Sequence, residues 1–393
     1  MTKKWEVFEP EEKLVKTIAK NNNISELVAK ILINRGITEQ KEIETFLKPK
    51  RHNFHDPFLM PDMQLAVNRI LKAIQEKTKT IIYGDYDVDG ITSITVLKKF
   101  LLECGIEVDY YIPNRLDEGY GLNKVAIEEI HQQGYKLIIT VDCGISAIEE
   151  IKYANSLGVD VIVTDHHETL EELPQAIAVV DAKRKDSTYP FKMLAGVGVV
   201  FKLIQAISIE LKLEEKQYLK YLDIVCIGTI SDIVPLVDEN RVIAKLGLKL
   251  VEVTKNVGLK AIIKASGYKK IDSNMISFGI APRINACGRM GHEEEAAKLF
   301  LTENITNANN ITALLNKYNK ERQDTEKAIY EEAIHKIEKY NNKNCIILSG
   351  ENWHHGVIGI VASKITDLYY KPTILLCIDK ENAKGSRKKY KRF

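Results

Sequence analysis

Acidic and histidine side chains follow four apolar segments of this chain, and they are the residues best suited to chemistry. The segments and the residues after them are 80–83 before GDYDVDG (84–90), 137–141 before DCG (142–144), 159–163 before TDHHE (164–168), and 227–231 before Asp232. In an open parallel sheet, ligands bind at the carboxyl ends of the strands, which lie about 5 Å apart. The side chains expected to converge there are those of Asp87, Asp89, Asp142 and His166.

This convergence predicts a two-metal centre. Several carboxylates so close together cannot all stay ionised without a counter-charge. A pair of divalent cations supplies that charge, and carboxylates with imidazole suit Mn²⁺ or Mg²⁺. Two such ions about 3.5–4 Å apart can activate water and stabilise the leaving oxygen in phosphoester hydrolysis. The sequence has no Walker lysine loop, which argues against nucleotide-driven phosphoryl transfer.

Each motif also has a purely structural interpretation. The segment DYDVDG resembles a calcium loop, but the twelfth position counted from Asp85 is Val96, where such a loop needs Glu. Asp142 could be only a helix N-cap, and the His166–His167 pair only a surface pair. The occurrence of all these motifs at strand ends favours the metal centre.

The elements that would position these residues form an alternating pattern. Short runs rich in Ile and Val are typical of strands that are covered on both faces. We predict strands at 80–83, 108–112, 137–141, 159–163 and 176–180, with helices at 91–104, 123–133 and 147–157. This rhythm predicts an α/β fold with a doubly wound parallel sheet.

The flanking regions are predicted to be mostly helical. We expect helices within 10–50 and at 63–76, and a largely helical region at 190–265 in which Gly196 and Gly198 mark a turn. A long polar helix at 305–341 is expected to bridge two domains or line a cleft. Beyond it we predict strands at 345–348 and 373–376 around a glycine-rich helix start at 356–359.

Composition excludes several classes of protein. The 393 residues are 45% hydrophobic and carry a formal charge of only +2, which excludes a generally polycationic nucleic-acid binder but not a local basic groove. Six dispersed cysteines without a CxxC pair argue against a zinc ribbon, a redox motif or a disulfide framework. Without a signal-like or membrane-spanning apolar segment, we expect a cytoplasmic protein.

The motifs resemble those of the DHH phosphoesterase superfamily and, within it, most closely the RecJ family of bacterial single-strand-specific DNA exonucleases. The four central segments are DYDVDG (85–90), VDCG (141–144), TDHH (164–167) and GTISD (228–232). The supporting segments are YIPNR (111–115), GIAPRINACGR (279–289) and WHHGVIGIVAS (353–363). The likeness extends from about Leu27 to Ser386.

This resemblance implies a domain organisation. It divides the chain into an N-terminal helical segment (1–78), a DHH catalytic domain (79–300), a connecting helix (301–342) and a smaller, incomplete α/β DHHA1 domain with a basic tail (343–393). It also implies degradation of single-stranded DNA from the 5′ end to 5′-mononucleotides, with Mn²⁺ or Mg²⁺, in recombination and repair. The implied protein is a monomer that works with a single-strand-binding protein and a helicase.

The resemblance also assigns roles to residues. The implied metal ligands are Asp85, Asp87, Asp89, Asp142, His166 and Asp232. The implied catalytic residues are Asp87, Asp142, His166 and His167, the last positioning or protonating the reacting phosphate. The implied DNA contacts are Arg115, Arg283, Asn285, Arg289, His354, Ser386 and Arg387. For each arginine the alternative is an ordinary surface residue in a salt bridge.

The likeness breaks off after Ser386. The family continues with a Gly-Arg-Ser element, a Gly-Gly-His segment and an OB-type domain, whereas residues 387–393 carry five positive charges and no acid. A solvated, frayed tail is the simplest interpretation of such a run. We expect a frameshift or premature stop, which would leave an unpaired sheet edge in the second domain and weaken DNA affinity and 5′-end selection.

Two other functions fit part of the sequence. Shorter relatives of this superfamily cleave short oligonucleotides or cyclic dinucleotides, but the segments PNR (113–115) and 281–289 favour the exonuclease. A catalytically weak scaffold for replication or repair would have lost its metal ligands, and the ligands predicted here are all present.

Overall fold

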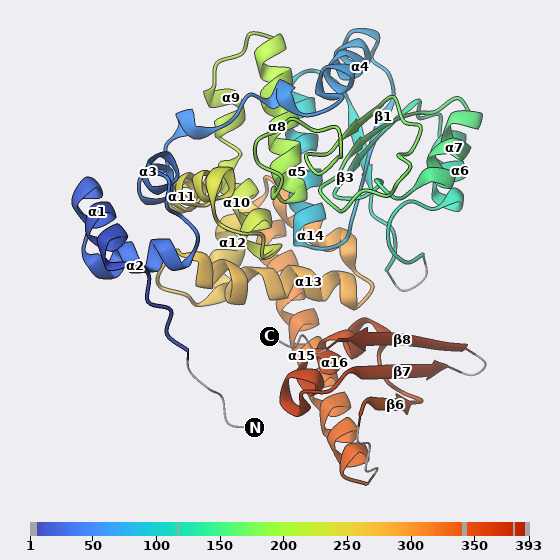
Figure 1. Cartoon of the computed structure of the whole chain (residues 1–393). Helices are drawn as coiled ribbons and strands as arrows, with labels where there is room; N and C mark the ends of the chain where they lie inside the picture. Colours follow the sequence, from blue (N-terminus) through green and yellow to red (C-terminus); the bar gives the residue numbers. More distant parts are fainter. Residues whose placement is uncertain (1–5, 116–117, 340–343, 380–381, 390–393) are drawn as a thin grey trace.

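The larger, N-terminal lobe is built on a five-stranded parallel sheet. The computed structural model describes residues 6–115, 118–339, 344–379 and 382–389 (Figure 1). The strand order is β2-β1-β3-β4-β5, with bounds β1 (Thr80–Gly84), β2 (Val108–Tyr111), β3 (Leu137–Val141), β4 (Asp160–Thr164) and β5 (Ala178–Val180). The register pairs Gly84 with Val141 and Val141 with Thr164, so the chain leaves β1, β3 and β4 at one edge.

Helices cover both faces of this sheet, as predicted for a doubly wound fold. The first face packs on α4 (Met63–Glu76), α5 (Val88–Glu103) and α8 (Gly196–Glu210), and the second on α6 (Lys124–Gln132) and α7 (Ile148–Ser156). Alternation along β1 places Ile82 in the first core, and Ile81 and Tyr83 in the second. Reversal of strand order between β1 and β3 creates the switch point where such folds bind ligands.

Two sequence predictions need correction here. Helix α5 begins at Val88, three residues earlier than predicted, because Asp87 caps its N-terminus by accepting hydrogen bonds from the amides of Asp89 and Gly90. Gly196 and Gly198 were predicted to mark a chain reversal, but they belong to the first helical turn of α8. The glycine at 196 is required by packing, because a Cβ atom there would lie 2.5 Å from Oδ1 of Asp142.

The rest of the lobe is helical. Its further helices are α1 (Glu12–Asn22), α2 (Glu26–Asn34), α3 (Gln40–Leu47), η1 (Arg51–Asn53), η2 (Pro57–Leu59), α9 (Lys216–Leu219), α10 (Leu222–Ser231), α11 (Asp238–Glu252), α12 (Val257–Ser266), η3 (Met275–Ile280), α13 (Ala281–Arg289) and α14 (Glu293–Leu301). A fully buried ion pair at 2.9 Å between Lys202 of α8 and Glu239 of α11 ties these layers together. Glu239 also accepts a hydrogen bond from the amide of His55, and Lys202 donates one to its carbonyl oxygen. The pair therefore fixes the segment before α4.

A helix of 35 residues, α15 (Ile305–Lys339), leads to the smaller C-terminal lobe (Figure 1). That lobe contains β6 (Ile346–Gly350), α16 (His355–Tyr369), β7 (Thr373–Asp379) and β8 (Asn382–Lys388). Strand β7 pairs parallel with β6 and antiparallel with β8. Residues 340–342, predicted to end the connecting helix, lie outside the described residues.

The predictions for the basic tail need correction at its beginning. Arg387 and Lys388 are not frayed, because they belong to β8 and pair with Ile374 and Thr373 of β7. Strand β8 pairs with β7 over the whole length of β7. Because β8 is itself at the edge of the described three-stranded sheet, the expected unpaired edge in the second domain stays a prediction. Residues 390–393 of the tail lie outside the described part of the chain. Within that part, no helix is both long and apolar enough to cross a bilayer.

Candidate metal centre

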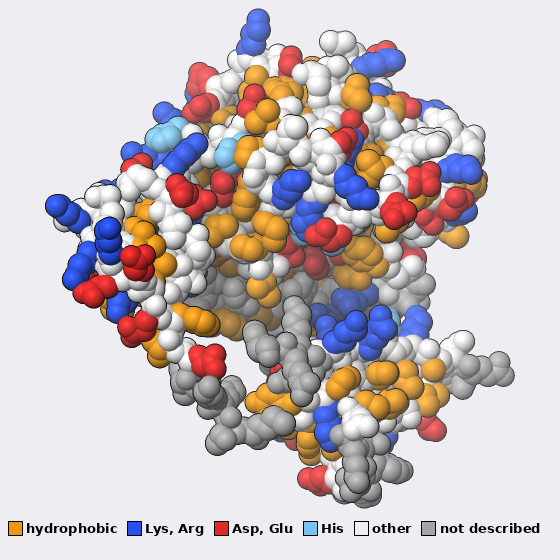
Figure 2. Space-filling model, in the orientation of Figure 1, with side chains coloured by type: hydrophobic (Ala, Val, Ile, Leu, Met, Phe, Trp, Pro, Cys, Tyr) orange, Lys and Arg blue, Asp and Glu red, His pale blue; other side chains and the backbone are white. Residues whose placement is uncertain are grey.

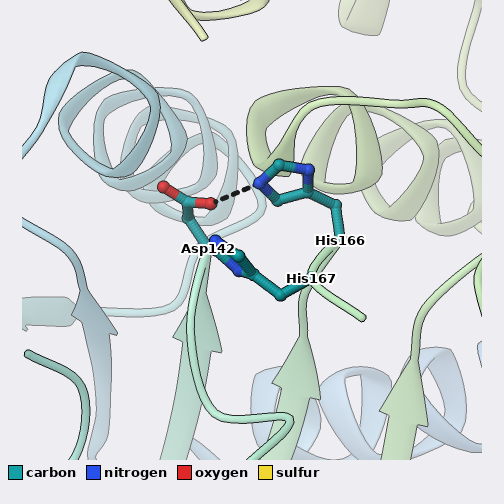
Figure 3. A group of neighbouring side chains, drawn as sticks. All are labelled: Asp142, His166 and His167. Carbon is teal, nitrogen blue, oxygen red and sulfur yellow. Dashed lines mark ion pairs between the residues drawn. The ribbon is translucent and has the colours of Figure 1, made fainter. Parts of the chain in front are cut away.

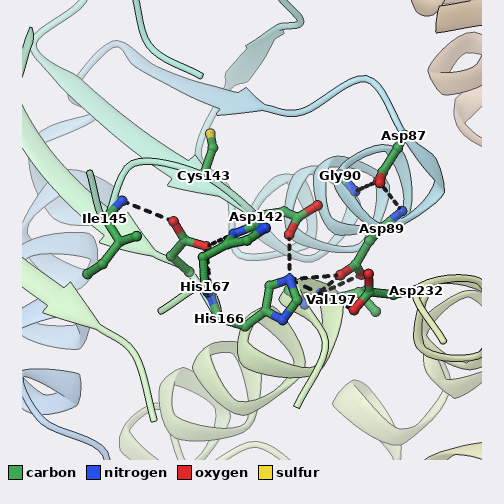
Figure 4. A network of polar contacts seen from close by, with 12 residues as sticks. Asp87, Asp89, Gly90, Asp142, Cys143, Ile145, His166, His167, Val197 and Asp232 are labelled. Carbon is green, nitrogen blue, oxygen red and sulfur yellow. Dashed lines mark hydrogen bonds and ion pairs between the residues drawn. The ribbon is translucent and has the colours of Figure 1, made fainter. Parts of the chain in front are cut away.

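The carboxyl edge of the sheet gathers seven acidic and histidine side chains, and all of them except that of Asp85 are labelled in Figure 4. Asp85 follows β1, Asp142 follows β3, and His166 and His167 lie in the loop after β4, separated from that strand by one residue. The start of α5 adds Asp87 and Asp89, and the end of α10 adds Asp232. Three overlapping groups each have ligand atoms within 4.8 Å of one another: Asp142, His166 and His167; Asp89, His166 and Asp232; and Asp85, Asp87 and Asp142.

His166 lies close to three of the carboxylates, and Figure 3 shows its contact with Asp142. Its Nε2 atom is 3.1 Å from Oδ1 of Asp142, 3.8 Å from Oδ2 of Asp89 and 3.9 Å from Oδ2 of Asp232. The side chains of Asp89 and Asp142 are only 1% and 4% exposed, whereas that of Asp232 is 23% exposed. The cluster is therefore closed beneath Asp89 and opens toward Asp232.

Local backbone chemistry fixes the two most buried acids. Asp142 has a φ of +58°, in the left-handed region that Asp tolerates better than most residues. The backbone amides of Gly196 and Val197 at the start of α8 donate to the two carboxylate oxygens of Asp89, at 2.6 and 2.9 Å. The positive end of the α8 dipole thus holds Asp89 in place.

Electrostatics make this cluster costly without a counter-charge. Burial raises the pKa of Asp85 to about 8 and that of Asp89 to about 7, and the charge of Asp87 contributes to both shifts. Burial and nearby aspartates likewise raise the pKa of Asp142 well above its usual range and that of Asp232 to about 7. Burial lowers the pKa of His166, which keeps its imidazole neutral and able to bind a metal.

These residues fit divalent cations. The buried Oδ1 atoms of Asp85 and Asp142 accept no hydrogen bond, which leaves them available as ligands. The set contains carboxylate oxygens and imidazole but no thiolate, because the nearby Cys143 is fully buried and burial raises the pKa of its thiol well above the usual range. Such a set suits Mn²⁺ or Mg²⁺.

Asp165 is a functional candidate that the sequence predictions missed. It is buried, and its carboxylate accepts hydrogen bonds from the amides of Ile145 and His166 and from Nδ1 of His167, the last at 2.7 Å. Burial raises the pKa of Asp165, but these hydrogen bonds outweigh it and leave the pKa below its ordinary value. The same bond raises the pKa of His167. The signal in the sequence that could have identified Asp165 is its position immediately before two histidines.

An aromatic and cationic wall borders His167. The hydroxyl of Tyr120 lies 3.2 Å from the carbonyl oxygen of Asp142 and 3.5 Å from Nε2 of His167. The ring of Tyr120 meets that of Tyr86 edge to face, and the guanidinium of Arg115 lies 4.8 Å from the centre of the Tyr86 ring. Arg115 thus lies near the metal centre, and its predicted role as a DNA contact stays a prediction; Tyr86 and Tyr120 are additions.

Helix α13 connects the centre to the second lobe. Oδ1 of Asn285 accepts a hydrogen bond from the amide of Val88, so this side chain supports the start of α5. Arg289 donates to the carbonyl oxygen of Gly356 in α16, and burial together with Arg115 and Arg322 lowers its pKa to about 10. Arg283 is oriented differently, because it bonds to Asn316 of α15 and to the carbonyl oxygen of Gly279. The contacts of Arg283 are those of a structural residue.

The C-terminal lobe supplies a basic face. His354 caps α16, and because its ring accepts the amide of Gly356, that amide is not free for a phosphate. Ser386 of β8 lies against Gly359 of α16, and Arg387 is exposed on the same strand. Figure 2 shows basic side chains gathered over β8 on the side that faces the N-terminal lobe. Three of the seven residues of β8 are basic.

Gly196 provides a test of this packing. In the Gly196→Ala variant the new Cβ would lie 2.5 Å from Oδ1 of Asp142, so either Asp142 or the start of α8 must move. We expect Mn²⁺ affinity, measured by calorimetry, to fall at least about tenfold and stability to fall by roughly 1–3 kcal/mol. The control is Gly198→Ala on the same helix turn, where the added atom meets only the side chain of Leu194 at 3.2 Å. Unchanged Mn²⁺ binding in Gly196→Ala would contradict the role of this glycine.

Comparisons with known proteins agree with this architecture. The sequence profile of the DHH family, N-terminal domain, matches residues 79–229. The single-stranded-DNA-specific exonuclease RecJ of Bacillus subtilis is 44% identical over 395 residues, which cover 99% of this chain and 50% of that protein. The RecJ of Haemophilus influenzae is 32% identical over 396 residues, which cover 95% of this chain and 68% of that protein. The chain belongs to the RecJ family.

A solved RecJ structure has the same fold. The crystal structure of RecJ in complex with Mn²⁺ from Thermus thermophilus superposes with a TM-score of 0.82 at 29% identity, over 94% of this chain and 53% of that one. The predicted fold class is therefore confirmed: a doubly wound DHH domain, a long helix and a smaller α/β lobe, all within the RecJ family. The chain spans about half the length of the Bacillus subtilis RecJ.

Proposed function

We propose that this chain hydrolyses single-stranded DNA from the 5′ end and releases 5′-mononucleotides, with two Mn²⁺ or Mg²⁺ ions as cofactors. The observation that carries the proposal is the cluster of five carboxylates and two imidazoles at the switch point of the sheet. Membership of a family whose named members are single-stranded-DNA-specific exonucleases supports the substrate.

The ions would be held by the six predicted ligands: Asp85, Asp87, Asp89, Asp142, His166 and Asp232. When bound, two such ions supply a hydroxide nucleophile and charge stabilisation for phosphodiester hydrolysis. The residues of the chain neutralise the charge of the ions, orient the reacting phosphate and protonate the leaving oxygen. Asp89, held by the start of α8, and Asp142, held by the turn after β3, fix the site in advance of substrate binding.

His167 is our candidate general acid. Hydrolysis that yields 5′-mononucleotides adds water to phosphorus and breaks the bond to the 3′ oxygen, which needs a proton as it leaves. The hydrogen bond from Nδ1 to Asp165 raises the pKa of His167 and therefore favours the protonated form. It also leaves Nε2, on the half-exposed side of the ring, to deliver the proton to the leaving oxygen.

The wall beside His167 suits a single strand. Arg115 lies close enough to Arg289 to contribute to the lowered pKa of Arg289, and a backbone phosphate between them would relieve that repulsion. Tyr86 and the half-exposed Tyr120 offer rings on which unpaired bases can stack without sequence preference. The basic face of β8, on the side toward the N-terminal lobe, extends the positive surface.

Arg283, Asn285 and His354 receive other roles in this proposal. Asn285 positions α5, and Arg283 joins α13 to α15, so neither is proposed as a direct DNA contact. His354 positions the start of α16. Ser386 and Arg387 stay predictions as phosphate contacts; as neighbours in β8 they point to opposite faces of the strand, and Ser386 faces Gly359 of α16. A single-strand-binding protein and a helicase as partners, and the monomeric state, stay predictions from the resemblance.

The test compares substrates on the purified chain with Mn²⁺. We expect a 5′-phosphorylated single strand, labelled at its 5′ end, to release labelled mononucleotide as the first product. Duplex DNA of the same sequence and a cyclic dinucleotide should react at least about a hundredfold more slowly, and EDTA should stop cleavage. Preferential hydrolysis of the cyclic dinucleotide would favour the phosphodiesterase alternative, and release of internal fragments first would exclude an exonuclease.

A further inference from the structure

Ile233 is the most exposed large apolar side chain in the described part of the chain. Its exposed fraction is 87%, so the side chain gains almost nothing from burial in the folded protein. It directly follows Asp232, the ligand candidate on the open side of the metal cluster. Because burial does not explain why an isoleucine occupies this exposed position beside a charged site, its presence requires another explanation.

The backbone of Ile233 makes the choice of isoleucine more unusual. Its φ is +63°, in the left-handed region where a branched Cβ crowds the backbone. Among the described non-glycine residues with positive φ, Ile233 is the one with a β-branched side chain; the others are Asn23, Asp62, Lys77, Asp142, Lys212, Asp238 and Tyr370. Glycine or asparagine would make the same turn with less strain.

The turn itself has a clear purpose. Helix α10 ends at Ser231, the amide of Asp232 still bonds to the carbonyl oxygen of Gly228, and the reversal at 233 stops the helix with Asp232 beside His166 and Asp89 (Figure 4). That purpose explains the left-handed backbone but not the isoleucine. Strain of this kind is concentrated at sites where the residue serves function.

We propose that Ile233 is a substrate-contacting residue, whose side chain packs against the sugar and base of the nucleotide bound at the metal centre. The inference rests on the proposed function. Phosphate oxygens are the part of a nucleotide that belongs at the ligands, and consecutive Cα atoms are about 3.8 Å apart. A side chain one residue beyond a ligand can therefore reach the groups attached to that phosphate, which are a deoxyribose and a base.

The test uses two variants that keep the turn. Ile233→Asn accepts the left-handed backbone but removes the apolar surface, and Ile233→Leu keeps an apolar side chain while it removes the branch at Cβ. On a 5′-phosphorylated oligo(dT) with Mn²⁺, we expect kcat/KM of Ile233→Asn to fall about five- to tenfold, mainly through KM, and that of Ile233→Leu to stay within about twofold. Both variants should melt at or above the temperature of the unchanged chain.

Oligonucleotides with an abasic tetrahydrofuran residue on either side of the scissile phosphate locate the contact. A loss in Ile233→Asn that disappears on the abasic strand assigns the contact to the base, and a loss of equal size on both strands assigns it to the sugar; either result supports the proposal. Cleavage by Ile233→Asn at the unchanged rate on every strand would overturn it.

Metal binding separates this proposal from a purely structural role. Calorimetric titration of Ile233→Asn with Mn²⁺ alone should give an unchanged affinity, because the ligand Asp232 keeps its backbone. A fall in Mn²⁺ affinity that matches the fall in kcat/KM would show that Ile233 acts through Asp232, and would overturn the proposal.

Binding also keeps the inference testable if the unchanged chain cleaves no DNA. In that case the proposed function fails by itself, and the Mn²⁺-loaded chain is titrated with thymidine 5′-monophosphate and with inorganic phosphate. The nucleotide should bind more tightly than phosphate, and Ile233→Asn should reduce that preference about five- to tenfold. An unchanged preference would overturn the nucleoside contact.

Discussion

The Asp142→Asn variant is expected to lose cleavage of single-stranded DNA by at least about a thousandfold. Asn tolerates the left-handed backbone at position 142 as well as Asp does, so the turn after β3 should stay intact. The substitution removes the negative charge that a cation needs and replaces one of the two carboxylate oxygens by an NH2 group, which cannot bind a metal. Mn²⁺ affinity, measured by calorimetry, should fall at least about a hundredfold for the same reason.

The same substitution should stabilise the metal-free protein. Burial and the neighbouring charges of Asp89, Asp87 and Asp85 hold the pKa of Asp142 well above its usual range, so a neutral side chain at this position removes repulsion. We expect the melting temperature in EDTA to rise by roughly 2–5 °C while activity is lost. A variant that keeps more than about a tenth of the activity would contradict the metal-centre assignment.

Asp223→Asn is the matched control. Asp223 is also a buried carboxyl group whose pKa is raised by burial, but it lies at the opposite end of α10 from Asp232. The amide of Ile224 donates to Oδ1 of Asp223 and the hydroxyl of Thr254 donates to Oδ2. In Asn the oxygen can keep the bond from Ile224, and the hydroxyl of Thr254 can instead accept a bond from the side-chain amide nitrogen. Mn²⁺ binding and cleavage should not change in this variant, which separates loss of a ligand from loss of a buried charge in general.

Stability of the metal-free protein is expected to fall as the pH rises from about 5 to about 8. A carboxyl group whose pKa is raised in the folded state stabilises the fold fully below the unfolded pKa, and this contribution is lost as pH rises through the folded pKa. Asp89 and Asp232, with pKa values of about 7, and Asp85, at about 8, all act in this direction. The raised pKa of His167 adds to it.

Thermal denaturation in EDTA at pH 5, 6.5 and 8 measures this effect. We expect the melting temperature to drop by about 5–10 °C over that range, because the buried carboxylates ionise with no cation to compensate them. Two groups have the opposite sign. The lowered pKa of His166 acts within this range, as one group against the four above whose pKa is raised, and the lowered pKa of Asp165 acts only in acid, below the range tested.

Adding Mn²⁺ should reverse the pH trend. A metal binds the ionised carboxylates, and at 100 times its dissociation constant a ligand stabilises the folded state by about 2.7 kcal/mol. At pH 8 the melting temperature should therefore rise on addition of Mn²⁺, and at pH 5 it should change little. A metal-free curve that is flat or rises between pH 5 and 8 would show that the cluster is not a set of mutually repelling acids.

Most of the candidate metal centre was predictable from local sequence. Parallel strands of a doubly wound sheet end at one edge, so residues directly after β1, β3 and β4 must lie near one another once the strands are recognised. Asp85, Asp142, His166 and His167 needed no further information. The same argument applies to the fold, because runs such as 80–83 and 137–141 can be buried only in a sheet covered on both faces.

The arginines were less predictable because an arginine can bind either a ligand or another part of its own chain. Arg115 and Arg289 lie near the centre, but Arg283 donates to Asn316, 33 residues away, and to the end of η3. Nothing in the segment PRINACGR distinguishes Arg283 from Arg289, because Asn316, the partner that decides the role of Arg283, lies on α15. The domain boundaries at 78, 300 and 342 stay predictions for a similar reason.

By itself the sequence determined the chemistry of this protein: which side chains could bind divalent cations, that they follow strands of a parallel sheet, and which family shares the motifs. These are properties of residue type and of short-range periodicity. The tertiary structure alone decided how the site is supported. The amides at the start of α8 hold Asp89, Gly196 leaves room for Asp142, Asp165 orients His167, and a strained Ile233 follows Asp232. Apart from the Asp165–His167 pair and the turn at Ile233, these contacts join segments distant in sequence, and such contacts exist only after the chain has packed.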